Sequence, residues 1–137
     1  MLEKSVKQLL TTHEGLRLFP YRCPVGRLTI GIGRNLEDKG ITKEEANFLL
    51  DNDIKEVLLD LEYIFPDLAS YPEQLQLVLM DMRFNLGPGR FRTFENMIAA
   101  VKQRNYRKML NEMVDSAWYD QVGQRSSNLV SLISEIA

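Results

Sequence analysis

Apolar residues recur every three or four positions at the start of the chain, the spacing that gives a helix one apolar face. Gly15 follows directly, and a glycine in this place is typical of a C-terminal cap. The pattern predicts a helix of about a dozen residues that ends at Glu14. Its positions at helical spacing are Leu2, Val6, Leu9, Leu10 and His13.

The stretch from Leu18 to Arg34 has a different pattern. Residues 19–26 contain two prolines and a glycine, which break helices and form turns. Residues 27–33 then alternate in the manner of a short strand. Glycines in a strand mark places where the backbone bends or where another group approaches closely. We therefore expect a small antiparallel hairpin or a three-stranded sheet.

Helical spacing dominates the remainder of the chain. Thr42 and Glu45 form a capping box, in which each side chain satisfies a free backbone donor of the other residue. Pro66 and Pro72 bracket a short break, and Gly87-Pro88-Gly89 is expected to stop the helix that precedes it. The expected helices cover residues 42 to about 64, 75–86, 94–101, 106–114 and 129–136.

Composition narrows the class of protein. With 137 residues, 45% of them hydrophobic and 26% charged, the chain resembles an ordinary globular protein, which excludes disorder and fibrous repeats. Its 17 basic and 19 acidic residues give a net charge of −2, which does not indicate a nucleic-acid partner. One cysteine excludes a disulfide framework, and one histidine offers no set of histidine metal ligands. We expect no metal and no cofactor.

The charges are unevenly distributed. Residues 37–67 hold ten acids and three lysines, whereas residues 90–108 hold six basic residues and one glutamate. Solvated helix faces account for such runs in most proteins. The alternative is that the basic region faces an anionic polymer.

The start of the chain, from Met1 to Lys7, carries charges where a signal peptide needs an apolar run. No run of about 18 apolar residues exists anywhere in the sequence. We therefore expect no export signal, no membrane span and a protein that folds in a cytoplasm.

Glu14 and Cys23 are the two residues best suited to a catalytic role. A carboxylate in the last turn of a helix faces the negative end of the helix dipole, which disfavours its ionised form. Burial beside Leu16 or Leu18 would act in the same direction, and both effects suit a general acid. This position by itself is weak evidence, however, because most carboxylates at helix ends are exposed and take no part in catalysis.

Cys23 lies among turn residues beside Arg22, and a nearby cation lowers a thiol pKa. A buried structural thiol is the commoner fate of a free cysteine. A cysteine protease would need a basic imidazole, and His13 has neither the spacing nor the context. The glycines of residues 29–34 do not indicate a nucleotide site either, because the third glycine of the dinucleotide motif is missing.

Taken together, these segments resemble the phage-type lysozymes, the endolysins and muramidases of glycoside hydrolase family 24. The family pattern is a glutamate, eight residues, an aspartate, five residues and a threonine. Glu14 and Thr29 stand at the required positions, and Cys23 occupies the place of the aspartate. The resembling segments are 13–18, 21–22, 26, 29–33, 84–87 and 116–121, together with Arg125.

The resemblance implies an α+β, mainly helical, two-lobed fold. A small N-terminal lobe with a β-hairpin or sheet, about residues 15–65, would be joined by a long helix to a helical lobe. That helical lobe would comprise about residues 66–137 plus the first helix, so that residues 1–137 form one catalytic domain.

The resemblance also implies a reaction. Glu14 would protonate the leaving oxygen of the β-1,4 bond between N-acetylmuramic acid and N-acetylglucosamine, and Cys23 with Thr29 would activate water on the opposite face of the sugar. That arrangement inverts the anomeric configuration. Cys23 in place of the family's aspartate is the important difference, since an unperturbed thiol is only about 3% thiolate at pH 7. Family members with cysteine here are active, so position 23 depends on thiolate formation or merely holds water.

Family cleft positions fall on Asn35, Phe84 and Asn85 as substrate-binding candidates, with Arg125 close to Glu14 in a supporting role. Phe84 suits a wall for sugar rings, with core packing as the alternative. Met97 and Glu112 occupy two further cleft positions but match poorly. We expect Trp118 to be core of the helical lobe, not a sugar platform.

The expected partner is bacterial peptidoglycan, without nucleic acid and without stable membrane association. By family analogy, a monomeric phage or prophage endolysin would accumulate in the host cytoplasm until a holin releases it to the periplasm and cell wall. Two alternatives keep the fold: a peptidoglycan-binding protein with weakened catalysis, and a lytic transglycosylase. A helical DNA-binding module is disfavoured by the acidic 37–67 stretch.

Overall fold

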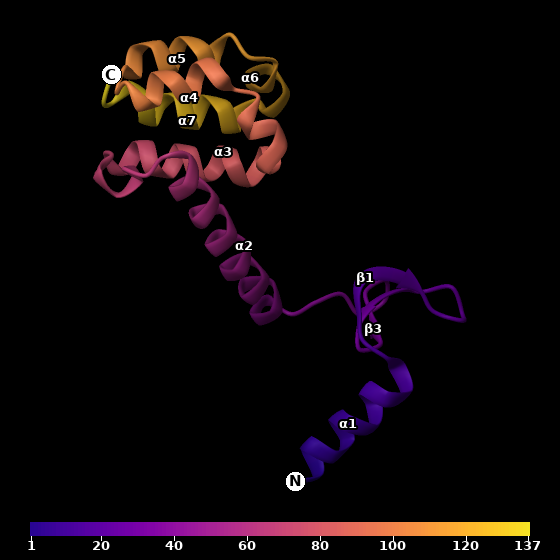
Figure 1. The fold of residues 1–137 in the computed structure, drawn as a ribbon. Coiled ribbons are helices and arrows are strands. Elements are labelled where there is room, and N and C mark those ends of the chain that lie inside the picture. The colour runs from indigo at the N-terminus through magenta and orange to yellow at the C-terminus, as the bar shows by residue number, and fades with distance from the viewer. The chain divides into compact units, whose positions relative to one another are not determined.

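The computed structural model describes residues 1–137, which form seven α-helices, one 3-10 turn and a three-stranded antiparallel sheet (Figure 1). The α+β, mainly helical class predicted from the sequence is confirmed. The chain divides into two compact units, residues 1–49 and residues 50–137, called here the N-terminal and C-terminal units. Whether the first helix joins the helical lobe stays a prediction.

The N-terminal unit begins with helix α1, Leu2–Glu14. The helix ends where the sequence predicts, because the N–H of Gly15 donates to the carbonyl of Thr11 at 2.9 Å while Gly15 has a φ of 75°. That left-handed backbone favours glycine at this position. No residue of α1 is buried, so its apolar face is exposed.

The sheet confirms the strands expected from the alternating pattern. Strands β1 (Arg17–Arg22), β2 (Leu28–Gly31) and β3 (Arg34–Asn35) lie in that order, and both pairs are antiparallel. Tyr21 on β1 pairs with Thr29 on β2. Thr29 is the one buried residue of the N-terminal unit, with 4% of its surface exposed.

Helix α2, Lys43–Ile64, starts in the N-terminal unit and ends in the C-terminal unit. The predicted capping box is present: the hydroxyl of Thr42 accepts from the backbone N–H of Glu45, and the Glu45 carboxylate accepts from the N–H of Thr42. Arg34 also donates to this carboxylate at 2.7 Å. Chiefly because of Arg34, and then because of the Thr42 N–H, the pKa of Glu45 is lowered to about 2.

The C-terminal unit consists of helices that lie side by side (Figure 1). Their buried apolar side chains form one core. Helix α5 packs against α4, α6 and α7, and α7 packs against α3. Besides the end of α2, its elements are η1 (Leu68–Ser70), α3 (Glu73–Arg92), α4 (Glu95–Lys102), α5 (Tyr106–Val114), α6 (Ala117–Val122) and α7 (Gln124–Ser134). The largest fully buried side chains are Trp118, Phe65, Phe91, Leu61, Leu75, Leu79, Met82, Met97, Met109, Met113, Ile133 and Val78.

Two details correct the sequence prediction. Gly87 interrupts α3 with a φ of 80° and a ψ of 169°, but helical turns resume after it and continue to Arg92. The expected stop is therefore a kink, because proline is tolerated in the first turn of the resumed helix. Helix α6 was not predicted, since six residues are too few to show a helical period.

No helix of the structure combines the length and the apolar composition that a membrane crossing requires.

Candidate functional site

A pocket of about 450 Å³ lies in the N-terminal unit where the end of α1 meets the sheet. It brings together Glu14, Cys23, Thr29 and Asn35, four residues singled out from the sequence. Phe84, Asn85 and Arg125 belong to the C-terminal unit. The remaining lining residues of this pocket are His13, Tyr21, Pro24 and Gly33.

Glu14 is the last residue of α1, and its side chain is exposed. Burial beside Leu16 or Leu18, which would favour the protonated form, does not occur, since these side chains are themselves 62% and 75% exposed. Leu16 lines an open hollow of the N-terminal unit that Ile30 and Phe48 also border. The Glu14 carboxylate lies against the backbone of Gly33, in the turn between β2 and β3.

Cys23 is half-buried and begins the turn between β1 and β2. Its N–H donates to the carbonyl of Arg27 at 3.0 Å, and the N–H of Gly26 donates to its carbonyl at 2.8 Å. The backbone N–H of Arg27 is the main cause that lowers the pKa of the thiol; partial burial opposes it, and the N–H groups of Val25 and Gly26 and the hydroxyl of Thr29 assist. The turn therefore favours the thiolate.

This cause differs from the one that the sequence suggested. Arg22 does not contribute to the lowered pKa of Cys23, because its guanidinium donates to the Glu37 carboxylate at 2.8 Å and to the carbonyl of Gly26. Arg27 donates to the other oxygen of Glu37 at 3.1 Å. The two arginines, Arg27 first, lower the pKa of Glu37 and tie the turn to the segment after β3.

Thr29 and Asn35 face the same pocket from β2 and β3. The Thr29 hydroxyl donates to the carbonyl of Arg27 at 2.8 Å, which fixes its oxygen beside the turn. Both ends of the Asn35 amide are engaged by Asp38: Oδ1 accepts from the backbone N–H at 3.0 Å and Nδ2 donates to the carboxylate at 3.0 Å. The amide is therefore held in one orientation before any ligand arrives.

Phe84 lies in a separate groove of the C-terminal unit, with a volume of about 370 Å³. Its side chain is 46% exposed, so core packing is the wrong interpretation of this residue. Arg125 borders the groove, where its Nε donates to the carboxylate of Asp81 at 2.6 Å. Its expected proximity to Glu14 stays a prediction. The other lining residues are Leu50, Ile54, Val57, Leu77 and Met80.

Asn85 has a structural contact that the sequence did not predict. Its Oδ1 accepts from the indole Nε1 of Trp118 at 3.2 Å. Trp118 is 1% exposed, which confirms it as core of the helical unit. Since one end of the amide satisfies a buried donor, the Nδ2 group is the end that remains available to a ligand.

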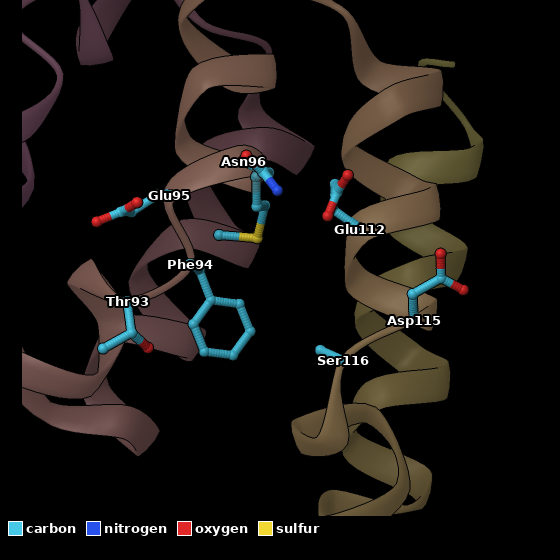
Figure 2. A pocket seen from close by; sticks show the side chains of 8 residues that line it. Thr93, Phe94, Glu95, Asn96, Glu112, Asp115 and Ser116 are labelled. Atoms are coloured by element: carbon cyan, nitrogen blue, oxygen red, sulfur yellow. The ribbon is translucent and has the colours of Figure 1, made fainter.

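Met97 and Glu112, the two poorly matching cleft positions, line a further pocket of about 250 Å³. Figure 2 shows Asn96 of α4 and Glu112 of α5 on opposite sides of it, with the ring of Phe94 at one end. Met97 is 1% exposed and belongs to the core. Ser116, on the same wall, caps α6 by accepting from the N–H of Tyr119. No cluster of acidic, histidine and cysteine side chains is arranged to hold a metal ion.

Comparison with known proteins finds a matching family and several relatives. A model of the Phage lysozyme family matches residues 11–132. The chain is 26% identical over 157 aligned residues to the pre-baseplate central spike protein Gp5 of Enterobacteria phage T4, an alignment that covers 94% of this chain and 27% of that protein. It is 24% identical over 159 residues to the probable T4-type lysozyme 1 of Dictyostelium discoideum, with 94% and 93% covered. The chain thus spans about a quarter of the spike protein's length.

Proposed function

Since the chain belongs to the phage lysozyme family, a family of lysozyme-type peptidoglycan hydrolases, we propose that it cleaves the β-1,4 bond between N-acetylmuramic acid and N-acetylglucosamine. The observation that carries the proposal is the pocket of the N-terminal unit. It holds the candidate acid Glu14 together with Cys23 and Thr29, which stand at the spacing of the family pattern.

In the proposed reaction, the Glu14 carboxyl group gives its proton to the leaving glycosidic oxygen as the bond to the anomeric carbon breaks. A water molecule attacks that carbon from the opposite face, and its proton passes to the Cys23 thiolate. Thr29 would orient the water through its hydroxyl oxygen. Two groups that act on opposite faces with water between them give inversion, and such groups are about 6.5–9.5 Å apart in known inverting enzymes.

The decisive experiment is digestion of purified peptidoglycan by the wild type and by Glu14→Gln. The amide cannot donate the proton, so we expect reducing ends to form at least about 1,000 times more slowly. Glu3→Gln, the same substitution at the other end of α1, is the control and should retain full activity. Undiminished digestion by Glu14→Gln would refute the proposal.

Product masses separate the alternatives that keep the fold. Hydrolysis adds water to each fragment and leaves reducing ends, whereas a lytic transglycosylase yields anhydro-sugars by internal attack. A protein that only binds the glycan would sediment with peptidoglycan and release no fragments.

The role of Cys23 needs its own experiment. The lowered thiol pKa supports a thiolate as the base, so treatment with iodoacetamide should abolish digestion, and the pH optimum should lie above that of Cys23→Asp. The rate of alkylation against pH reports the thiol pKa directly and should have its midpoint below that of free cysteine. An alkylated protein with unchanged turnover would remove Cys23 from the reaction.

We also propose the role of an endolysin that reaches the wall through a membrane lesion made by a holin. Lysis of an expressing bacterium should then require co-expression of a holin, and lysis without one would contradict this route.

Attraction to the anionic wall would depend on the basic 90–108 region. Arg92 is paired with Asp60, whereas the other five basic residues of that region, Arg90, Lys102, Arg104, Arg107 and Lys108, have no acidic partner, and binding should weaken with salt.

A further inference from the structure

Glu14 and Gly33 approach each other more closely than any side chain at position 33 would allow. A Cβ atom built on Gly33 would lie 2.8 Å from Oε2 of Glu14 and 2.9 Å from its Cδ and Cγ. Real Cβ atoms essentially never come so close to another heavy atom. The space that a side chain would occupy at position 33 is therefore filled by the carboxylate of Glu14.

Gly31, the last residue of β2 and two residues before Gly33, offers an internal comparison. Its φ is 71° and that of Gly33 is 69°, so both occupy the left-handed region that disfavours side chains. A Cβ on Gly31 would nevertheless meet nothing within 4 Å. The backbone explains a glycine at both positions, whereas the contact with Glu14 exists at Gly33 alone.

We propose that Gly33 is a positioning residue for the general acid: the absence of its side chain leaves the place in which the Glu14 carboxylate is held. The inference rests on the proposed function, in which Glu14 donates the proton. It explains how an exposed carboxylate at the end of a helix acquires a defined position without burial and without a hydrogen-bonding partner of its own in the N-terminal unit.

An added methyl group at Gly33 should affect catalysis more than folding. The three atoms that it would meet form the far end of a flexible, exposed side chain, which can move away at little cost. The carboxylate would then leave its place by about 1 Å or more, and misplacement of that size can cost about 100-fold in rate. The free energy of unfolding would fall mainly through backbone strain, and Gly31→Ala would introduce the same strain.

The test compares Gly33→Ala with Gly31→Ala. Both variants should lose similar stability in chemical denaturation, because their φ angles match. On purified peptidoglycan, Gly33→Ala should lose about 100-fold in kcat with little change in KM, whereas Gly31→Ala should stay within about threefold of the wild type. In a Glu14→Gln background, Gly33→Ala should cause no further loss, since the acid it displaces is already gone.

A spectroscopic measurement keeps the geometry separate from the activity. In the wild type, nuclear Overhauser contacts should join the Gly33 α-protons to the Glu14 γ-protons, and they should persist in Gly31→Ala but weaken in Gly33→Ala. Absence of these contacts in the wild type would overturn the inference whatever the activity, as would equal kcat losses in the two variants or a loss confined to KM. If the contacts behave as expected but no variant, wild type included, releases reducing ends, the proposed function fails and the placement of Glu14 stands.

Discussion

The two units of the molecule are stabilised by different means. In the C-terminal unit, eighteen apolar side chains form one buried cluster, from Val57 to Ile133. In the N-terminal unit a single residue, Thr29, is buried, and the order depends on strand pairing, turns and ion pairs such as those of Glu37 and Glu45. The proposed catalytic groups all lie in the second kind of environment.

The difference shows how a site can be defined where packing is sparse. Side chains in a core are fixed by neighbours on all sides, so their positions follow from burial. In the N-terminal unit, backbone geometry takes this role: the N–H groups of the turn favour the Cys23 thiolate, and Gly33 leaves the place for Glu14. Changes to backbone and turn residues should therefore disturb the site most, and changes to the core should disturb stability most.

The largest effect on stability should come from truncating a buried side chain in the core of the C-terminal unit. Phe65 is fully buried with its ring edge-on to Tyr71, so Phe65→Ala should lower the free energy of unfolding by about 3–5 kcal/mol. Phe19→Ala, at a ring that is 82% exposed on β1, should stay within about 0.5 kcal/mol. Chemical denaturation followed by circular dichroism measures both, and similar losses would show that the N-terminal unit has a core after all.

The next effect concerns an ion cluster beside that core. Arg92, and then Arg83, lower the pKa of Asp60 to about 2 from its ordinary value of 3.8. A lowered pKa in the folded state stabilises above the unfolded pKa, so Asp60 should contribute about 2 kcal/mol at neutral pH, lost progressively as pH falls from about 5 to about 1. Asp60→Asn should therefore be less stable than the wild type at pH 7, and the difference should shrink steadily and vanish below about pH 2. An unchanged difference at low pH would show that Asp60 does not act through its charge.

A smaller loss is expected at the contact between Asn85 and the core. Asn85→Ala would leave the buried indole N–H of Trp118 without an acceptor, at a cost of about 1–3 kcal/mol. Asn85→Asp keeps the acceptor oxygen and should recover most of the stability. If denaturation followed by Trp118 fluorescence shows no loss for the alanine variant, Asn85 serves a ligand only.

The smallest effect should be that of salt on the N-terminal unit. The arginine side chains paired with Glu37 are 50% and 64% exposed, and the pairs are screened at about 1 M salt, where the Debye length is about 3 Å. Amide exchange in the turn between β1 and β2 should accelerate by about twofold or less, while the core helices remain unchanged. A larger acceleration would mean that these ion pairs carry more of the unit's order than exposed pairs ordinarily do.

By itself, the sequence determined the features that depend on near neighbours along the chain. The end of α1 at Gly15, the capping box of Thr42 and the antiparallel strands follow from hydrogen bonds and periodicities within a few residues, and the pattern of Glu14, Cys23 and Thr29 follows from their spacing. Even locally the prediction was incomplete, since the chain resumes helical turns after Gly87 and forms the short α6.

Only the tertiary structure decided which groups meet across longer separations. The Trp118 indole on Asn85, the arginines on Asp60 and the Glu14 carboxylate against Gly33 are such contacts. Each depends on how strands, turns and helices are placed in space, and no periodicity in the sequence encodes the distance between atoms that the chain brings together from far apart.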